Sequence, residues 1–195
     1  METDWILDAS GRIPNVEELG LEEVGVKYNE HGIEVNDHLQ TSVDNIYASG
    51  DVVDKKQPKL TPTAIYETTY LMKLFSNVTT EPLVYPAIPS VVFTSPRIAQ
   101  VGTAPASVAN DSSYSVNEND LLAGWYRLVD NEAYAKNTIV YDADHKIVGA
   151  AEVSEKADNA INSILPAIEF GWGPEELSRL VYLFPSLESD TKDLL

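Results

Sequence analysis

Short apolar runs separated by turn-forming residues dominate the second half of the chain and predict an antiparallel β-sheet. Because β-branched and aromatic residues favour strands, we expect strands over residues 90–94, 98–102, 125–129, 138–141 and 147–153. The last two runs flank a polar turn sequence, so the prediction joins them as a hairpin.

Helical periodicity follows the last of these strands. Residues 157–170 carry an apolar face at helical spacing, made of Ala160, Ile161, Ile164, Leu165 and Ile168. Gly171 is suited to end this helix, and Pro174 begins a shorter one. Strands followed by helices predict an α+β domain, an antiparallel sheet of about five strands with flanking helices.

The first part of the chain has the pattern of a smaller α/β piece. Apolar runs predict short strands over residues 4–9, 33–35 and 45–48. A helix is expected from about residue 61 to residue 76, with Thr61 as its N-cap. Proline suits the first turn that follows such a cap.

Three prolines, at positions 82, 86 and 89, indicate a domain boundary near residues 80–87. We therefore expect two parts. Residues 1–80 would be an incomplete α/β fragment that exposes surface normally covered by a larger sheet. Residues 84–195 would be the α+β domain.

The negative net charge of the chain disfavours some classes of binding partner. The chain has 31 acidic and 13 basic residues, a formal net charge of −18, which disfavours nucleic acids and anionic membranes because both are polyanions. No apolar stretch approaches the ~18–20 residues that a membrane-spanning helix needs. The first residues resemble no signal peptide, so we expect a cytoplasmic protein.

The chain contains no cysteine. This excludes a disulfide framework, a thiolate nucleophile, an iron–sulfur cluster and a thiolate zinc site within the chain. The three histidines, His31, His38 and His145, stand apart in polar, turn-like sequences, where a solvated loop histidine is the simplest interpretation. We therefore predict no metal site.

One turn has the character of a ligand-binding site. Asp51 directly follows a predicted strand that ends in Gly50, and the carboxyl ends of strands are where α/β sheets bind ligands. An aspartate there can accept hydrogen bonds from a hydroxyl-rich chain. The helix start at Thr61, Pro62 and Thr63 offers free N–H groups and a partial positive charge. On spacing alone, a capped turn and an ordinary helix start explain these residues as well.

Several motifs, in the same order and at the same spacing, resemble the pyridine nucleotide–disulfide oxidoreductase family of glutathione reductase and dihydrolipoamide dehydrogenase. Residues 8–15 are similar to its A-x-G-R-x-P-N segment, and residues 40–52 to its Q-T-S-V-x-x-I-Y-A-x-G-D-V motif. Residues 60–64 resemble L-T-P-x-A. Residues 89–102 resemble the P-x-V-V-F-T-x-P-x-I-A-x-V-G segment that opens the family's interface domain. The likeness covers essentially the whole chain.

The resemblance implies a role for particular residues. Asp51 matches the aspartate that hydrogen-bonds the FAD ribityl chain, and Gly50 the turn that lets the backbone approach the cofactor. The backbone of Thr61, Pro62 and Thr63 would face the pyrimidine side of the isoalloxazine. The two residues that match the segment bordering FAD are Gly11 and Arg12.

The resemblance also shows what the chain lacks. It has neither the Gly-x-Gly-x-x-Gly that seats the FAD pyrophosphate, nor the one for NAD(P)H, nor the Cys-x4-Cys redox pair. Phe184 stands where the family has its acid/base histidine, and Ser189 where it has the partnering glutamate. A shift of one residue would place Glu188 at the glutamate position without restoring the histidine. We predict no catalytic residue in this chain.

A parent enzyme built on this chain would lack the ordinary proton donor, so it would use another electron acceptor, such as a quinone, oxygen, a metal ion or a different disulfide. We expect FAD in the full-length parent and little or none on this chain alone. We also expect a homodimer through the C-terminal domain, with the helix over 157–170 and the sheet edge as contact surfaces.

Three interpretations remain open: a fragment of a flavoenzyme, a free-standing dimerisation or interaction module, and a small independent enzyme. No convergent set of acid, base and nucleophile supports the third. The acids Glu152, Glu155 and Asp158 are explained more simply as a charged loop before a helix.

Overall fold

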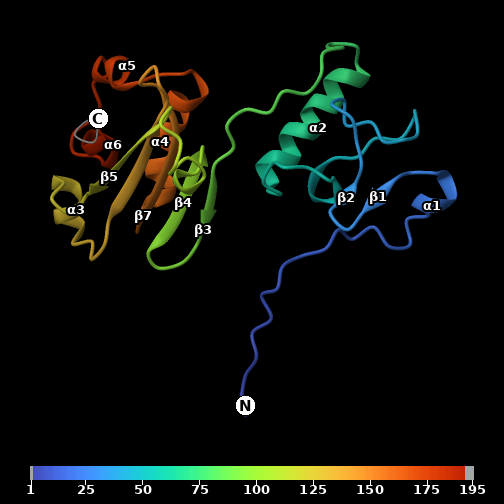
Figure 1. Ribbon diagram of the computed structural model, residues 1–195, viewed down its shortest axis with the longest axis horizontal. Coiled ribbons are helices and arrows are strands. Elements are labelled where there is room, and N and C mark those ends of the chain that lie inside the picture. Colours follow the sequence, from blue (N-terminus) through green and yellow to red (C-terminus); the bar gives the residue numbers. More distant parts are fainter. Residues whose placement is uncertain (1, 192–195) are drawn as a thin grey trace. The chain divides into compact units, whose positions relative to one another are not determined.

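The computed structural model describes residues 2–191. The chain divides into two compact units, Met1–Tyr85 and Pro86–Leu195, and each is described by itself (Figure 1).

The first unit is a small assembly of short elements around one long helix. Its elements are α1 (Leu21–Val24), β1 (Tyr28–Asn29), β2 (Gly32–Ile33), the 3-10 turn η1 (Gly50–Val52) and α2 (Thr61–Phe75). A core of five buried aliphatic residues holds the turns together: Val16, Val26, Ile33, Ala48 and Val53.

A close approach of two backbones fixes the β1–β2 turn beside η1. Gly32 has φ +141°, and a Cβ there would lie 2.3 Å from the carbonyl oxygen of Val52. Only glycine fits both the conformation and the space. The backbone of Asp54 then donates a hydrogen bond to the carbonyl of Ile33, which ties the segment after η1 to β2.

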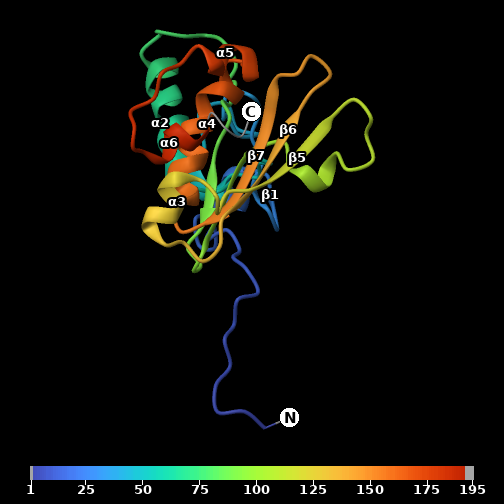
Figure 2. The ribbon, with the colours of Figure 1, turned by 90° about the vertical axis from the view of Figure 1, so that its left-hand side faces the viewer.

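The predicted strand over residues 4–9 is wrong. These residues form an extended segment with no partner strand (Figure 2), and Trp5, Ile6 and Leu7 are 89%, 86% and 90% exposed. A strand needs a neighbour for its N–H and C=O groups, and the described residues provide none. These three apolar side chains are therefore left exposed to solvent.

Other local predictions for this unit need correction. The run at 33–35 contributes only Ile33 to β2, and the run at 45–48 makes a single bridge, between Gln40 and Tyr47. The helix over 61–76 is confirmed as α2, but Leu60 is its N-cap and Thr61 is its first residue, with no side-chain cap.

The second unit is built on a five-stranded sheet in the order β3-β4-β7-β6-β5, with every neighbouring pair antiparallel. The strands are β3 (Ser90–Val92), β4 (Arg97–Gly102), β5 (Ser115–Asp120), β6 (Lys136–Tyr141) and β7 (Ile147–Ser154). The helical elements are η2 (Pro105–Ser107), α3 (Trp125–Asp130), α4 (Ala157–Glu169), α5 (Pro174–Ser178) and α6 (Leu187–Thr191). The predicted α+β class and the β6–β7 hairpin are confirmed.

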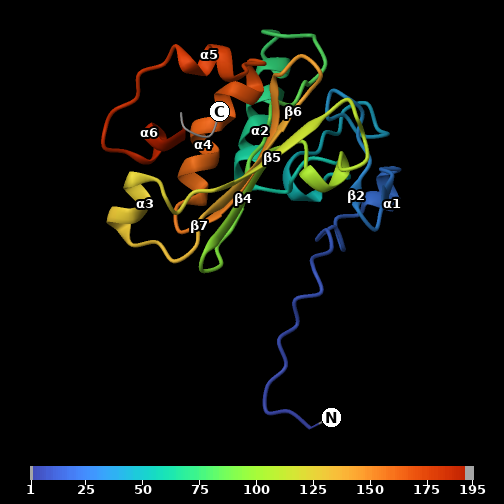
Figure 3. The same cartoon turned by 60° about the vertical axis from the view of Figure 1, so that its left-hand side comes forward.

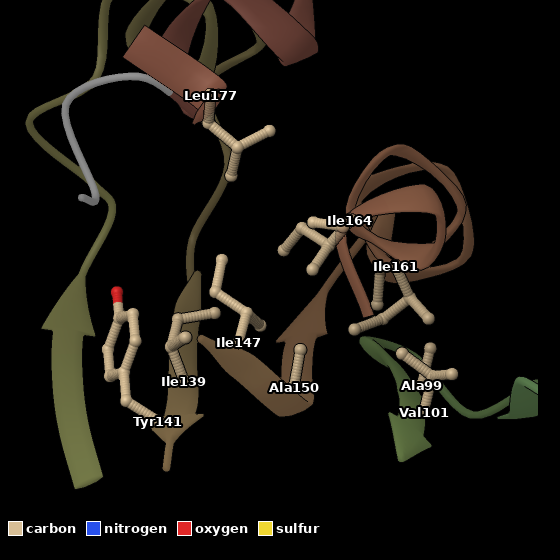
Figure 4. Packing of buried hydrophobic residues seen from close by; sticks show 11 residues of the cluster. Ala99, Val101, Ile139, Tyr141, Ile147, Ala150, Ile161, Ile164 and Leu177 are labelled. Carbon is tan, nitrogen blue, oxygen red and sulfur yellow. The ribbon is translucent and has the colours of Figure 1, made fainter. Parts of the chain in front are cut away.

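Helix α4 covers one face of this sheet (Figure 3). Figure 4 shows Ile161 and Ile164 pointing from α4 toward Ala99 and Val101 of β4 and Ala150 of β7. Leu177 of α5 closes the end of the same cluster. Burying these side chains provides most of the stability of the unit, at about 25 cal/mol for each Å² of apolar surface removed from water.

Two elements of the second unit were misread from the sequence. The run at 125–129 is helix α3, not a strand, because Gly124 caps it and Asn131 ends it in the left-handed conformation. Strand β5 was missed, since it is a polar edge strand whose residues are almost all exposed and therefore lack an apolar alternation.

A buried ionic cluster explains why α3 forms at this place. Arg127 of α3 donates hydrogen bonds to Glu132 at 2.9 Å and to Glu152 at 2.5 Å, and the hydroxyl of Ser154 also donates to Glu152. Burial raises the pKa of Glu152, and the Arg127 charge opposes this rise. Glu152 is therefore a buried residue of β7, and its interpretation as a charged loop residue is wrong.

The helix over 157–170, which we expect together with the sheet edge as a dimer contact, buries its apolar face in its own chain, and the contact itself stays a prediction. Ala160, Ile161 and Ile164 are buried against the sheet of their own chain. That face is occupied, so it offers little apolar surface to a partner.

Replacing a core residue of α4 should destabilise the second unit far more than the same change at its sheet surface. Ile161→Ala, at a side chain 1% exposed, should lower the free energy of unfolding by about 2–5 kcal/mol. Ile98→Ala, at a side chain 45% exposed in β4, is the control and should cost less than half as much. Denaturant titration measures both, and equal losses would contradict the packing described here.

Candidate functional site

The site begins at the turn of Gly50 and Asp51, which forms η1. Gly50 has φ +79°, a conformation that favours glycine. Helix α2 lies close by, since a Cβ at position 50 would be in van der Waals contact, 3.5 Å from the Cβ of Ala64. The turn therefore places the exposed carboxylate of Asp51 beside the start of α2.

Asp51 and the first turns of α2 line one open groove of about 410 Å³. Its other lining residues are Thr61, Ala64, Ile65, Thr68 and Thr69. The first N–H groups of a helix have no intrahelical acceptor, so this groove combines a carboxylate, free amide donors, hydroxyl groups and two apolar side chains. It can hydrogen-bond a ligand that carries both hydroxyls and carbonyls.

The two predicted site residues Pro62 and Thr63 differ in exposure. Pro62 is exposed in the first turn of α2. Thr63 is buried, and its hydroxyl donates to the carbonyl of Pro58 at 2.8 Å. Only the backbone of Thr63 remains for a ligand, which is the role that the resemblance assigned to it.

A buried carboxylate behind the groove fixes the turn. Glu67 of α2 is 0% exposed, and it accepts a hydrogen bond from the N–H of Gly50 at 2.5 Å. Its other oxygen accepts from the ammonium of Lys55 at 2.5 Å and from the hydroxyl of Tyr85 at 2.7 Å. Three segments distant in sequence thus meet at one side chain.

Glu67 stabilises the protonated phenol of Tyr85 and balances the charge of Lys55. Burial, followed by the hydrogen bond to Glu67, raises the pKa of Tyr85, so the phenol stays protonated and donates. The Lys55 side chain is only 4% exposed, so its charge is compensated by Glu67 rather than by water. The sequence alone did not predict this network. The available signal was the position of Glu67, which lies at helical spacing from Thr63 and Tyr70 and so on the buried face of α2.

Two predicted cofactor-binding residues lie elsewhere. Arg12 lines a second groove, which shares no lining residue with the groove at Asp51. Gly11 has φ +118° in the exposed N-terminal segment, and no atom lies within 4 Å of the place where its Cβ would be. The structure therefore brings together Gly50, Asp51 and the start of α2, but not Gly11 and Arg12.

The structure shows the surroundings of Phe184 and Ser189, the two residues that stand at the family's acid/base positions by resemblance. The ring of Phe184 lies 5.2 Å from the ring of Trp125, centroid to centroid. The hydroxyl of Ser189 donates to the carbonyl of Ser186 at 2.6 Å. Neither side chain can transfer a proton at neutral pH.

Histidines and metals add little to the site. His38 is half-buried, with its Nδ1 atom 2.7 Å from the hydroxyl of Tyr70, so the interpretation of it as a solvated loop residue is wrong. Among residues 2–191 no group of three or more His, Cys, Asp or Glu side chains could hold a metal ion. Within the same residues no helix is long and apolar enough to cross a bilayer.

Comparison with known protein families decides the ancestry of the two units. Residues 1–68 match the family model described as pyridine nucleotide-disulphide oxidoreductase, and residues 88–194 match the model of its dimerisation domain. The chain belongs to the pyridine nucleotide-disulphide oxidoreductase family. The second unit is thus a dimerisation domain of this family, and most of the first unit matches the model named after the family itself.

The relatives of the chain fall into two length classes. An uncharacterized 19.7 kDa protein in a mercuric resistance operon of Staphylococcus aureus is 32% identical, over 91% of this chain and 100% of its own length. Dihydrolipoyl dehydrogenases of Buchnera aphidicola and Bacillus subtilis are 35% and 30% identical. The chain covers only 39% and 41% of those two proteins.

Solved structures agree on the fold. The HOCl-induced flavoprotein disulfide reductase RclA from Escherichia coli superimposes with a TM-score of 0.83 at 22% identity, over 95% of this chain and 43% of RclA. LpdA from Mycobacterium tuberculosis gives 0.82 at 22% identity, over 93% of this chain and 40% of LpdA. The family fold is therefore retained.

Removing the charge of Glu67 should destabilise the first unit. Glu67→Gln keeps the volume but leaves Lys55 buried without a counter-ion, which costs about 3–5 kcal/mol. Denaturant unfolding followed by far-ultraviolet circular dichroism measures the loss of unfolding free energy. The control is Glu34→Gln at an exposed acid of the same unit, where we expect a change within about 0.5 kcal/mol. Equal stability of Glu67→Gln and the native chain would contradict the role of Glu67.

Proposed function

We propose that this chain provides the dimerisation domain and the ribityl-facing turn of a FAD-dependent NAD(P)H oxidoreductase, and that it is catalytically inactive alone. The observation that carries the proposal is the groove shared by Asp51 and the start of α2. A carboxylate can accept hydrogen bonds from the hydroxyls of a ribityl chain, and helix N–H groups can donate to carbonyls of a flavin edge. Gly50, Asp51, Thr61, Pro62 and Thr63 would form this half of the FAD site.

Inactivity of the chain alone follows from the chemistry it lacks. It contains no cysteine and no Gly-x-Gly-x-x-Gly for a dinucleotide pyrophosphate. Phe184 at the acid/base position cannot protonate a thiolate. The described residues thus offer a surface for part of a flavin, without a redox-active thiol pair or a proton donor to work with it.

A second candidate function is a free-standing dimerisation or interaction module. The Staphylococcus aureus relative favours it, because the match extends over the whole of that short protein. In this case the chain would associate with another copy or with a full-length flavoenzyme. We place either form in the cytoplasm, with neither nucleic acid nor membrane as partner, because the net charge of −18 repels polyanions.

Flavin titration of the purified chain tests the first proposal. We expect no submicromolar FAD affinity and no oxidation of NADH or NADPH with quinone or oxygen as acceptor, because most FAD contacts of the family lie outside this chain. Flavin fluorescence and nicotinamide absorbance measure the two properties. Tight FAD binding or turnover would contradict the proposal, whereas retention of a full-length flavoenzyme during purification would favour the interaction module.

The surface best suited to a partner copy lies on α3 and the segment before α6. Exposed apolar side chains gather there, and we call this set the C-terminal patch: Trp125, Leu128, Val129, Val181, Leu183 and Phe184. Trp125 and Phe184 join its two segments through their ring contact. Contiguous exposed apolar residues of this kind mark interaction sites, and the family name of this domain indicates dimerisation. We propose the C-terminal patch as the homodimer contact.

A charge placed in the C-terminal patch should dissociate the dimer. Phe184→Asp should shift the molar mass from dimer to monomer, because an aspartate would be buried unpaired in the interface. The chain offers a matched control, since Phe170 is 68% and Phe184 65% exposed, and Phe170 also packs on a tryptophan. Phe170→Asp should leave the dimer intact. Light scattering coupled to size exclusion measures the molar mass. If the Phe184→Asp variant remained a dimer, the C-terminal patch would not be the dimer contact.

A further inference from the structure

A buried group of charges with one negative charge in excess joins α3 to β7 in the second unit. The side chains of Arg127, Glu132 and Glu152 are 3%, 2% and 1% exposed. One terminal nitrogen of Arg127 donates to both oxygens of Glu132, at 3.0 and 2.9 Å, and the other donates to Glu152 at 2.5 Å. One positive and two negative charges leave a net charge of −1 when all three groups are ionised.

The strands on either side of Glu152 supply no second cation. Its register partners are Ala99 of β4 and Asn137 of β6, and neither carries a charge. Asn137 is itself hydrogen-bonded to another neutral amide, that of Asn119 on β5, at 2.9 Å. The hydroxyl of Ser154 donates to Glu152 at 2.6 Å but adds no charge.

The cations on the adjoining elements are bound to other acids. Lys156, just before α4, pairs with Asp130 of α3 and also donates to the hydroxyl of Tyr126. Arg97 of β4 pairs with Asp158 of α4. In the part of the chain that the structure describes, no ion pair joins a further Lys or Arg to either glutamate of the cluster. The excess negative charge is therefore not balanced by side chains.

Uptake of one proton would remove this excess charge. Two carboxylates that share one site resist ionising together, and burial disfavours the charged form of each. Burial raises the pKa of Glu152, and the charge of Glu132 adds to the rise, whereas Arg127 and the hydroxyl of Ser154 oppose it. The folded chain therefore binds this proton more tightly than the unfolded chain does.

The raised pKa of Glu152 fixes the direction of the effect on stability. The folded state gains stability as the pH falls through this raised pKa, and the gain is complete below the pKa of an ordinary glutamate. The same stability is lost again as the pH rises through the raised pKa. The contact between α3 and β7 is thus more stable in mildly acidic than in alkaline solution.

We propose that Arg127, Glu132 and Glu152 form a proton-binding site that controls how firmly α3 is held against β7. Helix α3 carries three side chains of the C-terminal patch, so proton uptake at the cluster should strengthen association through that patch. The effect on association rests on the proposed homodimer contact, whereas proton binding itself does not.

Carbon-13 NMR of the glutamate side-chain carboxyl groups in the whole chain tests proton binding directly. We expect one carboxyl signal that titrates at higher pH than those of the exposed glutamates and that is absent from Glu152→Gln. Glu132→Gln should move this titration to lower pH, because the cluster is then neutral when Glu152 is ionised. A Glu152 signal that titrates together with the exposed glutamates would overturn the proposal.

Denaturant unfolding between about pH 8 and pH 5 measures the coupling of the proton to stability. As the pH falls, the folding equilibrium constant of the native chain should rise relative to that of Glu152→Gln, by up to about tenfold for each pH unit. The comparison cancels the gain from protonating the other acids, which both chains share. Glu118→Gln, at an exposed acid of β5, is the matched control and should follow the native profile. Parallel profiles of the native chain and Glu152→Gln would contradict a proton site at the cluster.

Light scattering over the same pH range separates proton binding from association. The dimer dissociation constant of the native chain should fall more steeply on acidification than that of Glu152→Gln. A dimer with the same pH dependence in both chains would overturn the coupling to the C-terminal patch. If no dimer forms at any pH, the homodimer contact and this coupling are both wrong, whereas a Glu152 titration at raised pH would still establish the proton site.

Discussion

The buried carboxylate of Glu67 is the interaction on which the first unit depends. Its two oxygens hold the N–H of Gly50, the ammonium of Lys55 and the hydroxyl of Tyr85. A buried charge is tolerated only when it is paired and fully hydrogen-bonded, so these contacts have to be kept together. As a result the turn at Asp51, the segment of Lys55 after η1 and the end of the unit at Tyr85 are all fixed against α2.

The core of the second unit is apolar and contains no buried carboxylate like that of Glu67 among the residues of its cluster. Helix α4 buries one face of the antiparallel sheet, and Leu177 of α5 closes the cluster. Its buried ionic cluster, formed by Arg127, Glu132 and Glu152, attaches α3 to β7. This attachment positions Trp125 next to Phe184 and so assembles the C-terminal patch.

The two units match two different models of the pyridine nucleotide-disulphide oxidoreductase family. The turn that would meet the ribityl chain and the sheet of the dimerisation domain are retained. The ring of Phe184, which would stand at the family's acid/base position, packs on Trp125. The chain contains no cysteine, and the C-terminal patch of its second unit is exposed.

The sequence by itself determined the family, the α+β class, helices α2 and α4, and the β6–β7 hairpin, because periodicity and ordered motifs are local properties of the chain. It also determined that no thiol chemistry is available. Local pattern failed wherever a distant partner decides the outcome. Residues 4–9 have strand composition but no neighbouring strand, and α3 is helical where Arg127 reaches Glu152.

Only the tertiary structure decided which site residues meet. It brought Asp51 to the start of α2 through Glu67, and it placed Arg12 in a different groove with Lys56 and Lys59. It also used the apolar face of α4 for the core and left the C-terminal patch exposed. The physical reason is the same in each case: hydrogen bonds, ion pairs and burial join residues far apart in sequence, and no local pattern encodes their partners.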